Sequence, residues 1–287
     1  MNSDEKNIVL GGTLYLVATP IGNLADISER ALKVLSSVDF VAAEDTRNSG
    51  KLLSLFGIKK PMISYFEHNK RIRGDEIVEK ILSGLSCALI TDAGMPAISD
   101  PGEDIVRLCH EKGVPVSVIP GPCAAVSALA MSGLPTGKFV FEGFLSAQKS
   151  ERRRALEAIK SESRTIIFYE APHKLTNTLS DMLDILGDRR IALCRELTKI
   201  NEEVISTTIG AAIDHYSSHE PRGEYVLVVS GESHEDSLKN AFFANMSIEE
   251  HVKHYEDLGM SRTDAMKACA KDRGVSKSDI YAVIMKK

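Results

Sequence analysis

The sequence predicts an α/β protein with two sheet-containing domains and a small helical extension at its C-terminal end. Over roughly the first 130 residues, short apolar runs alternate with helical patterns, which is typical of a mostly parallel sheet. From residue 139 to residue 229 the apolar runs have shorter connections, which indicates a mixed sheet with antiparallel pairs. After residue 233 only three short helical patterns follow, with Gly259 and Gly274 as stops. We therefore expect domains at residues 1–121, 122–232 and 233–287.

The composition is that of an ordinary globular protein. The chain has 287 residues, of which 43% are hydrophobic and 26% charged. No apolar run is long enough to span a membrane, and residues 1–7 lack the apolar core of a signal peptide. We therefore expect a cytoplasmic protein without membrane contact. The net charge of −5 provides no general attraction to nucleic acid, so an RNA partner would need local basic patches.

Several common ligand motifs are absent. The five cysteines form no Cys-x-x-Cys pair, so neither structural zinc nor a disulfide framework is expected. The sequence contains no Gly-x-Gly-x-x-Gly fingerprint, no complete P-loop, no Gly-x-Ser-x-Gly elbow and no His-Glu-x-x-His motif. We expect a ligand that is held neither by a phosphate cradle nor by a metal.

In the first domain, each predicted strand is a short apolar run that ends at a turn or at charged residues. Asp26 or Ser28 can cap the first helix, because either side chain precedes the apolar pattern. The expected strands are 14–18, 38–43, 62–65, 87–90 and 114–119. The expected helices run from about residue 28, over 49–56 and 77–85, from residue 102, and over 124–131.

The second domain and the extension are predicted in the same way. Its strands are expected at 139–144, 165–169, 191–194, 204–209 and 225–229. Its helices are expected at 149–160 and 175–186. The extension is expected to form helices at 247–258, 262–273 and 277–285.

The loop over residues 91–102 is the most informative stretch of the chain. It follows a buried strand, is broken by Gly94, Pro96, Pro101 and Gly102, and is about twice as long as such connections usually are. Asp100 lies where it can cap the next helix. The loops at 19–23 and 120–123 also follow predicted parallel strands, whose carboxyl ends share one edge of the sheet. We expect the three loops to converge on a ligand.

Two groups of charged residues are candidates for chemistry or for RNA contact. The cluster Glu44-Asp45-Thr46-Arg47 comes directly after the second predicted strand. The predicted helix at 149–160 carries a basic patch, and the last two helices are also basic. We expect the RNA contacts of the patch to be Lys149, Arg152, Arg153 and Arg154. The competing interpretation is a solvated helix face without a partner.

Seven stretches together resemble one family of proteins. They are LVATPIGNL at 16–24, AEDTR at 43–47, SYFEHN at 64–69, TDAGMP at 91–96 with SDPG at 99–102, PGP at 120–122, FYEAPH at 168–173 and RELTK at 195–199. The chain resembles the tetrapyrrole-methylase superfamily and, more narrowly, its ribosomal RNA small subunit methyltransferase I group. One departure is Cys123-Ala124, where many superfamily members carry serines.

The resemblance implies an enzyme with two α/β domains that bind S-adenosylmethionine between them. It implies methylation of a cytidine ribose 2′-hydroxyl in 16S rRNA of the small ribosomal subunit, and a homodimer. We expect the cofactor to contact the convergent loops and the ends of the later strands. These residues are Pro20, Gly94, Met95, Pro96, Ile98, Ser99, Asp100, Pro122, Ala124, Tyr169, Glu170, Ala171 and Leu197.

Activation of the acceptor hydroxyl calls for a hydrogen-bond acceptor and a nearby cation. Glu44 and Asp45 with Arg47 supply both charges at one strand end, and Arg47 could also pair a flanking phosphate. Glu170 with His173 is the competing pair. For each of these residues, capping or ion pairing is the structural alternative.

Two rival functions remain open at this point. A porphyrin or other small-molecule methylase on the same fold would not need the basic helices. An RNA-binding module that only senses a ligand would need no group to activate a hydroxyl.

Overall fold

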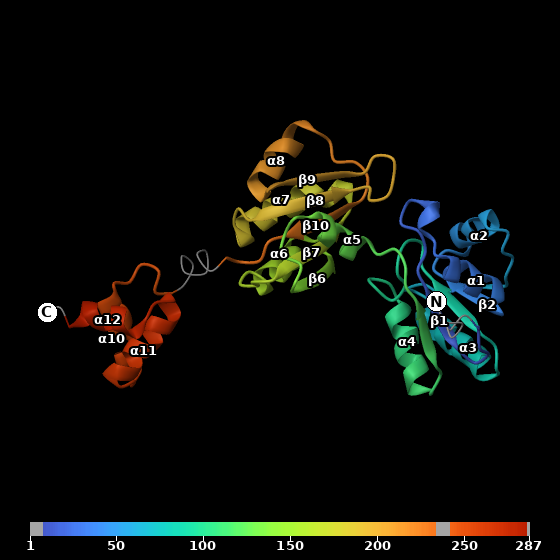
Figure 1. Cartoon of the computed structure of the whole chain (residues 1–287). Coiled ribbons are helices and arrows are strands. Elements are labelled where there is room, and N and C mark those ends of the chain that lie inside the picture. The colour runs from blue at the N-terminus through green and yellow to red at the C-terminus, as the bar shows by residue number, and fades with distance from the viewer. Residues whose placement is uncertain (1–7, 234–241, 286–287) are drawn as a thin grey trace, which may run out of the picture. The chain divides into compact units, whose positions relative to one another are not determined.

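The computed structural model describes residues 8–233 and 242–285. The described parts of Met1–Glu157 and Thr165–Ser230 form one compact unit, and those of Ala158–Arg164 and Gly231–Lys287 form a second (Figure 1). The N-terminal segment named above, residues 1–7, lies outside the described residues, and so do residues 234–241 near the start of the extension. Both sheets belong to the first unit, so the expected boundary between residues 121 and 122 stays a prediction.

The first sheet is parallel throughout, as predicted. Its strands lie in the order β3-β2-β4-β1-β5. They are β1 (Leu14–Val17), β2 (Phe40–Ala43), β3 (Met62–Ser64), β4 (Cys87–Ile90) and β5 (Val116–Ile119). Because all five strands run the same way, their carboxyl ends meet at one edge, where the loops of interest begin.

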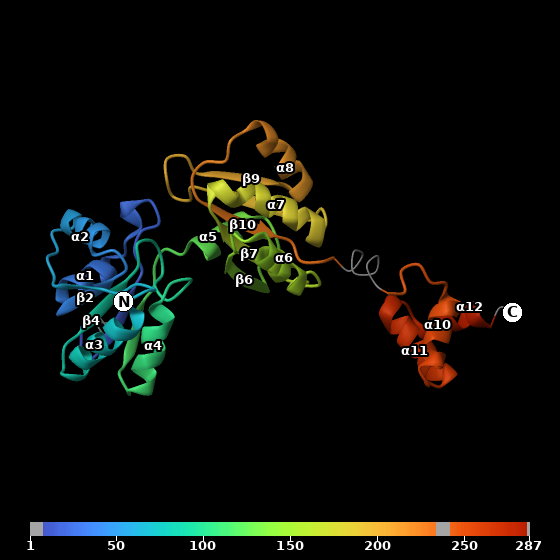
Figure 2. The same cartoon turned by 180° about the vertical axis from the view of Figure 1, so that it is seen from behind.

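Helices cover both faces of this sheet (Figures 1 and 2). On one face, α1 (Glu29–Ser37) and α2 (Thr46–Leu55) pack into the core through residues such as Leu35 and Leu53. On the other face, α3 (Lys70–Leu82) and α4 (Gly102–Glu111) contribute Ile77 and Ile105. A short 3-10 helix, η1 (Leu24–Asp26), follows β1. The result is a doubly wound α/β layer arrangement.

Different side-chain contacts hold the first turns of two of these helices. Ser28 caps α1, because its Oγ accepts a hydrogen bond from Ala31 N at 3.0 Å, so Ser28 rather than Asp26 holds this position. The predicted start of α3 at residue 77 is wrong by seven residues. Its first two turns are polar and give no apolar signal in the sequence. Lys70 in the first turn is held by an ion pair with Asp104 at 2.8 Å.

The second sheet is mixed, as predicted, in the order β6-β7-β10-β8-β9. β6 pairs with β7 in parallel, and the other neighbours are antiparallel. The strands are β6 (Phe139–Phe144), β7 (Thr165–Glu170), β8 (Arg190–Arg195), β9 (Glu203–Thr208) and β10 (Tyr225–Val229). The helices are α5 (Ala124–Met131), α6 (Lys149–Ala158), α7 (Pro172–Leu186) and α8 (Ile209–Ser218).

Helix α8 was not expected from the sequence. The predicted strand over 204–209 ends at Thr208, whose side chain caps the helix by accepting a hydrogen bond from Ala211 N. Ile209 therefore begins a helix rather than ending a strand. Its apolar pattern is short, and buried Ile209, Ala212 and Tyr216 are the residues that pack.

The second unit contains the three predicted helices. They are α10 (Ile248–Asp257), α11 (Arg262–Arg273) and α12 (Lys277–Ile284). A serine caps each of them, and Gly274 adopts the left-handed conformation that ends α11. They share a small core that includes Val252, Met266 and Ile280. None of the helices in the described ranges is long and apolar enough to cross a membrane.

Candidate active site at the strand ends of the first sheet

The loops after β1 and β4 are joined through Thr19 and Gly94. Thr19 N donates a hydrogen bond to Gly94 O at 2.9 Å, and Gly94 N donates one to Thr19 O at 3.1 Å. Thr19 is fully buried, and its Oγ1 also donates to Thr91 O at 3.1 Å. These three bonds bring the two loops together, as the shared sheet edge predicts.

Gly94 also brings the third loop to the same point. Its φ of +87° lies in the region that favours glycine. A Cβ added there would lie 3.2 Å from Ile21 Cγ2 and 3.6 Å from Pro122 O. Residues from the loops after β1, β4 and β5 therefore meet around one glycine that has no room for a side chain.

The rest of the 91–102 loop is held in an unusual conformation. Ala97 and Ser99 have φ values of +68° and +63°, which side chains rarely adopt. Asp100 Oδ1 stabilises this path by accepting hydrogen bonds from Ala97 N at 3.0 Å and from Gly102 N at 2.7 Å. Strained backbone that neighbouring groups hold in place is common at ligand sites.

The other oxygen of the Asp100 carboxylate has no partner. Oδ2 is buried and accepts no hydrogen bond within the described part of the chain. Leaving a buried carboxylate oxygen without a donor is costly, and such atoms are rare in folded proteins. The geometry therefore fits a ligand that brings a hydroxyl or amino donor to this loop.

The surroundings of Glu44, at the end of β2, make its carboxylate a stronger base. Partial burial raises the pKa of its carboxyl above the usual range, and the like charges of Asp92, Asp100 and Asp45 act in the same direction. The Thr91 hydroxyl opposes this shift by donating a hydrogen bond to Oε2 at 3.1 Å. Glu44 is thus linked to the residue that follows β4.

Asp45, the next residue, is occupied by structural contacts. Its Oδ1 caps α2 by accepting a hydrogen bond from Arg47 N at 2.8 Å. Its Oδ2 pairs with the Arg47 guanidinium at 3.1 Å. The hydrogen bonds from Arg47 lower the pKa of Asp45, so this carboxylate is a weaker base than Glu44. The Arg47 side chain itself is largely exposed.

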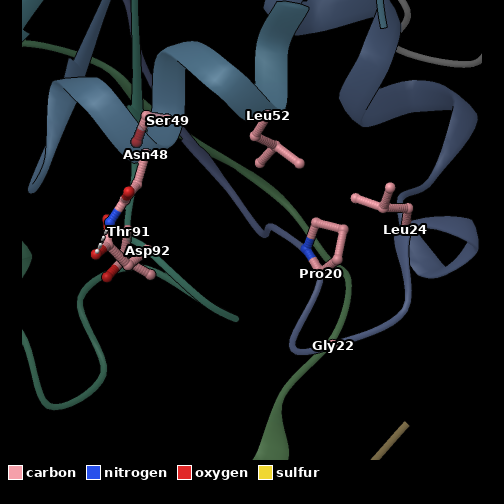
Figure 3. Close-up of a pocket in the computed structure, with 8 residues that line it drawn as sticks. All are labelled: Pro20, Gly22, Leu24, Asn48, Ser49, Leu52, Thr91 and Asp92. Carbon is pink, nitrogen blue, oxygen red and sulfur yellow. Dashed lines mark hydrogen bonds between the residues drawn. The ribbon is translucent and has the colours of Figure 1, made fainter. Parts of the chain in front are cut away.

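A small cavity lies beside this cluster (Figure 3). Its volume is about 180 Å³. The loop after β1, the first turns of α2 and the residues after β4 form its walls. The lining residues are Pro20, Gly22, Leu24, Asn48, Ser49, Leu52, Thr91 and Asp92. Thr91 connects the cavity to Glu44 through the hydrogen bond described above.

The competing pair after β7 is arranged differently. Glu170 is buried, and its Oε1 accepts a hydrogen bond from Ala171 N at 2.8 Å and pairs with Lys174 at 2.9 Å. Its Oε2 accepts a hydrogen bond from Thr178 Oγ1 at 2.6 Å. Both oxygens are satisfied inside the first turns of α7, so Glu170 is corrected from a candidate base to a structural residue. His173 is exposed on the same helix.

One apolar cluster gathers several of the predicted cofactor residues. Ile21, Ala124, Tyr169 and Leu197 all belong to it or pack against it. The Tyr169 hydroxyl accepts a hydrogen bond from Ala125 N at 3.2 Å, and burial raises the pKa of Tyr169 to about 12. Two regions of the second half of the unit, β7 and the loop after β8, thus reach the same place as the loops of the first sheet.

The predicted RNA contacts do not all lie on the surface. Arg152 is buried, donates a hydrogen bond to Asp181 at 2.8 Å and bonds two backbone carbonyls. It is therefore corrected from an RNA contact to part of the packing between α6 and α7. Arg153 is half-buried and pairs with Asp181 and Asp184. Lys149 and Arg154 are exposed and form no ion pair with any described residue.

Several residues of the site were not singled out from the sequence. They are Thr19, Asn48, Ser49, Thr91 and Asp92. Thr19 and Thr91 follow strands directly, which is a signal that sequence reading could have used. Ser49 gave no signal, because a serine within a helix usually has no special role. Among the described residues, no three His, Cys, Asp or Glu side chains are grouped to hold a metal ion.

The chain is similar to proteins of known families. The family model of the Tetrapyrrole (Corrin/Porphyrin) Methylases matches residues 13–213. The Ribosomal RNA small subunit methyltransferase I of Halalkalibacterium halodurans is 47% identical over 95% of this chain and 94% of its own. The protein of that name from Bacillus subtilis is 47% identical over 94% of this chain and 93% of its own.

Solved structures show the same fold at low sequence identity. Uroporphyrin-III-C-methyltransferase from Thermus thermophilus has a TM-score of 0.55 and 20% identity, covering 76% of this chain and 94% of that one. A diphthine synthase has a TM-score of 0.61 and 15% identity, covering 77% of this chain and 90% of that one. At these identities the likeness concerns the fold alone.

Proposed function

The chain belongs to the ribosomal RNA small subunit methyltransferase I family, and from that premise we propose that it methylates a cytidine ribose 2′-hydroxyl in 16S rRNA. The methyl donor that this family implies is S-adenosylmethionine. The observation that carries the proposal is the carboxyl of Glu44, which is exposed, has a raised pKa and is hydrogen-bonded to Thr91 in the wall of a cavity at the strand ends of the first sheet. A hydroxyl acceptor needs such a base, whereas a module that only binds RNA does not.

The residues at the loop junction fit this donor. S-adenosylmethionine, when bound, supplies a methyl group on a positively charged sulfur. Its ribose hydroxyls and amino groups are the kind of donor that the buried Asp100 Oδ2 lacks. The apolar side chains of Ala124, Tyr169 and Leu197 fit an adenine ring. The tight turn at Gly94 lets backbone approach the ligand closely.

Glu44 is the residue we assign to the acceptor hydroxyl. A carboxylate with a raised pKa accepts a proton more readily than an ordinary glutamate does. Thr91 holds its Oε2, which fixes the direction of the carboxyl group. Arg47 keeps Asp45 in place, and its exposed guanidinium is available for an RNA phosphate.

We assign RNA contact to the exposed cations of α6, and we take the oligomeric state of the enzyme from its family. Of the four predicted RNA contacts, Lys149 and Arg154 remain as the expected phosphate contacts, because only these two are both exposed and unpaired among the described residues. An rRNA substrate places the enzyme in the cytoplasm. We also propose a homodimer, which sedimentation at several protein concentrations would test.

Methyl transfer to ribosomal RNA tests the function directly. Small subunits and naked 16S rRNA, both from a strain that lacks this methyltransferase, are incubated with the protein and tritium-labelled S-adenosylmethionine. We expect label in the RNA, in a cytidine-containing dinucleotide that resists alkali, because a 2′-O-methyl group blocks cleavage of the next phosphodiester. Label that is released with single nucleotides would contradict ribose methylation. Label in a tetrapyrrole and none in RNA would favour a small-molecule methylase.

A further inference from the structure

The cavity beside Glu44 contains a polar group that the proposed catalytic role does not use. Ser49 is 3% exposed, and its Oγ has no hydrogen-bond partner within the described residues. Two other serines in helices of this chain behave differently. Ser37 and Ser54 each donate a hydrogen bond, at 2.7 Å, to the carbonyl four residues earlier. Ser49 makes no such bond, and its residue lines the cavity (Figure 3).

The walls of the cavity are divided by chemistry. Pro20, Leu24 and Leu52 form an apolar side, and Asn48, Ser49 and Asp92 form a polar side. Asn48 Nδ2 donates only a long hydrogen bond, at 3.4 Å, to Asp92 Oδ2. The second oxygen of Asp92 accepts no hydrogen bond from any described residue. An apolar wall opposite a polar one is the arrangement that receives a planar ring with one polar edge.

The size of the cavity limits what it can hold. At about 180 Å³ it is smaller than the roughly 300–1,000 Å³ of ordinary small-molecule sites. A whole S-adenosylmethionine therefore exceeds it, whereas a single pyrimidine ring is of suitable size. The cavity also adjoins the proposed base, because Thr91 both lines it and bonds Glu44.

The polar side of the cavity can distinguish cytosine from uracil. A carboxylate accepts a hydrogen bond from the exocyclic amino group of cytosine. Uracil has a carbonyl oxygen at that position, which a carboxylate repels. The amide of Asn48 and the hydroxyl of Ser49 can each donate to the ring nitrogen or carbonyl of cytosine.

We propose that this cavity receives the base of the acceptor nucleotide, turned out of the RNA, and that Asp92 makes it specific for cytosine. The proposal rests on the proposed function, because it places the ribose of the same nucleotide near Glu44. It goes further by assigning the choice of nucleotide to Asn48, Ser49 and Asp92.

Nucleotide binding tests the cavity without any methyl transfer. The full chain, with S-adenosylhomocysteine at saturation, is titrated with cytidine 5′-monophosphate and separately with uridine 5′-monophosphate. Binding is followed by the NMR signals of the Leu24 and Leu52 methyl groups. We expect the cytidine nucleotide to shift both signals and to bind at least fivefold more tightly, which is the lower end expected for one base contact.

Three variants make the test specific. Asp92→Asn should remove the preference for cytidine, because an amide can face either an amino group or a carbonyl. Ser49→Val should weaken binding of both nucleotides, because it removes the hydroxyl donor and adds a methyl group to the polar wall of the cavity. Ser54→Val is the matched control, because Ser54 lies exposed on the same helix and does not line the cavity. It should behave like the wild type.

The outcomes separate this proposal from the proposed function. Equal binding of both nucleotides, no shift with either, or binding that occurs only when S-adenosylhomocysteine is left out would each overturn the base pocket. RNA methylation that keeps its preference for cytidine in Asp92→Asn would also overturn it, while leaving the proposed function intact. Selective binding of the cytidine nucleotide by a protein that methylates no RNA would overturn the proposed function and leave the pocket supported.

Discussion

Two strands of this protein, β2 and β7, end in the same way but lead to different environments. Each is followed directly by a helix, and each has a glutamate at its carboxyl end, Glu44 and Glu170. Glu44 has one side-chain hydrogen bond, from Thr91, three acidic neighbours and a raised pKa. Glu170 is buried, and three groups of its own helix and strand end satisfy both oxygens.

The difference shows that position along a strand does not decide the role of a charged residue. The hydrogen-bond and ion-pair partners of Glu170 all lie within eight residues of it, and they hold its carboxylate at the start of α7. Glu44 lacks such local partners, because the next residue, Asp45, already caps α2 and pairs with Arg47. A carboxyl without local partners is the one that stays available to a substrate. Five predictions sharpen this comparison, in order of decreasing effect.

Removing the Glu170 carboxyl should have the largest effect, and the effect should be on folding. Glu170→Ala leaves Lys174 without its buried partner, and breaking a buried ion pair costs about 3–5 kcal/mol of unfolding free energy. Chemical denaturation measures this loss. The single-turnover methylation rate of the folded protein should stay near that of the wild type. A variant of normal stability that no longer methylates RNA would return Glu170 to the list of catalytic candidates.

Neutralising Glu44 should affect the rate rather than the fold. Glu44→Gln should lower the single-turnover rate by about a hundredfold or more, the range for a lost positioned base, or about 2.7 kcal/mol. Asp45→Asn is the matched control and should have the smaller effect on rate. Near wild-type rates in Glu44→Gln at every pH would show that this carboxyl is not the base.

The raised pKa of Glu44 also fixes the direction of two pH effects. The wild-type rate should fall as the pH drops through a pKa above the usual glutamate range, because the base becomes protonated. Since the pKa is higher in the folded than in the unfolded state, the ionised carboxyl lowers stability at neutral pH. This penalty disappears when the pH falls below the unfolded pKa. Glu44→Gln should therefore be at least as stable as the wild type at pH 7, the opposite of Glu170→Ala.

A side chain at Gly94 should weaken cofactor binding. In Gly94→Val the Cβ would press against Ile21 and Pro122, and overpacking of about 1–3 kcal/mol corresponds to roughly tenfold or more in affinity. Gly113→Val is the matched control, because Gly113 has a similar φ of +71° but no atom within 4 Å of its added Cβ. Calorimetry with S-adenosylmethionine compares the two. Equal affinities in both folded variants would remove the loop junction from the cofactor site.

The smallest effect is expected from the exposed arginine of α6. Arg154→Ala should reduce the salt dependence of RNA binding by about 0.7–0.9 in the log–log slope, the value for one phosphate contact. Arg152→Ala should instead lower the unfolding free energy, because it removes the buried partner of Asp181 Oδ2 and leaves this carboxylate with Arg153 alone. An unchanged slope in Arg154→Ala would mean that this face of the helix is only solvated.

Much of this architecture follows from local patterns in the sequence. The strands at 87–90 and 225–229 were predicted with the bounds that the structure has, because continuous apolar runs of that length are typical of buried strands. The convergence of the loops at residues 19–23 and 91–102 followed from the parallel order of their strands. By contrast, α8 was missed and α3 was begun too late, because neither segment shows a long apolar stripe.

By itself, the sequence determined the two kinds of sheet, the loop edge that carries the site and the charged cluster after β2, since apolar periodicity and strand direction are local properties. Only the tertiary structure decided which polar groups are engaged and which are free. Arg152 is removed from the surface by Asp181, which lies 29 residues away in the chain. Ser49 and Asp100 each have a buried oxygen that finds no hydrogen-bond partner in the part of the chain that the structure describes. Burial and hydrogen bonding depend on neighbours that are distant in sequence, so no local pattern reports them.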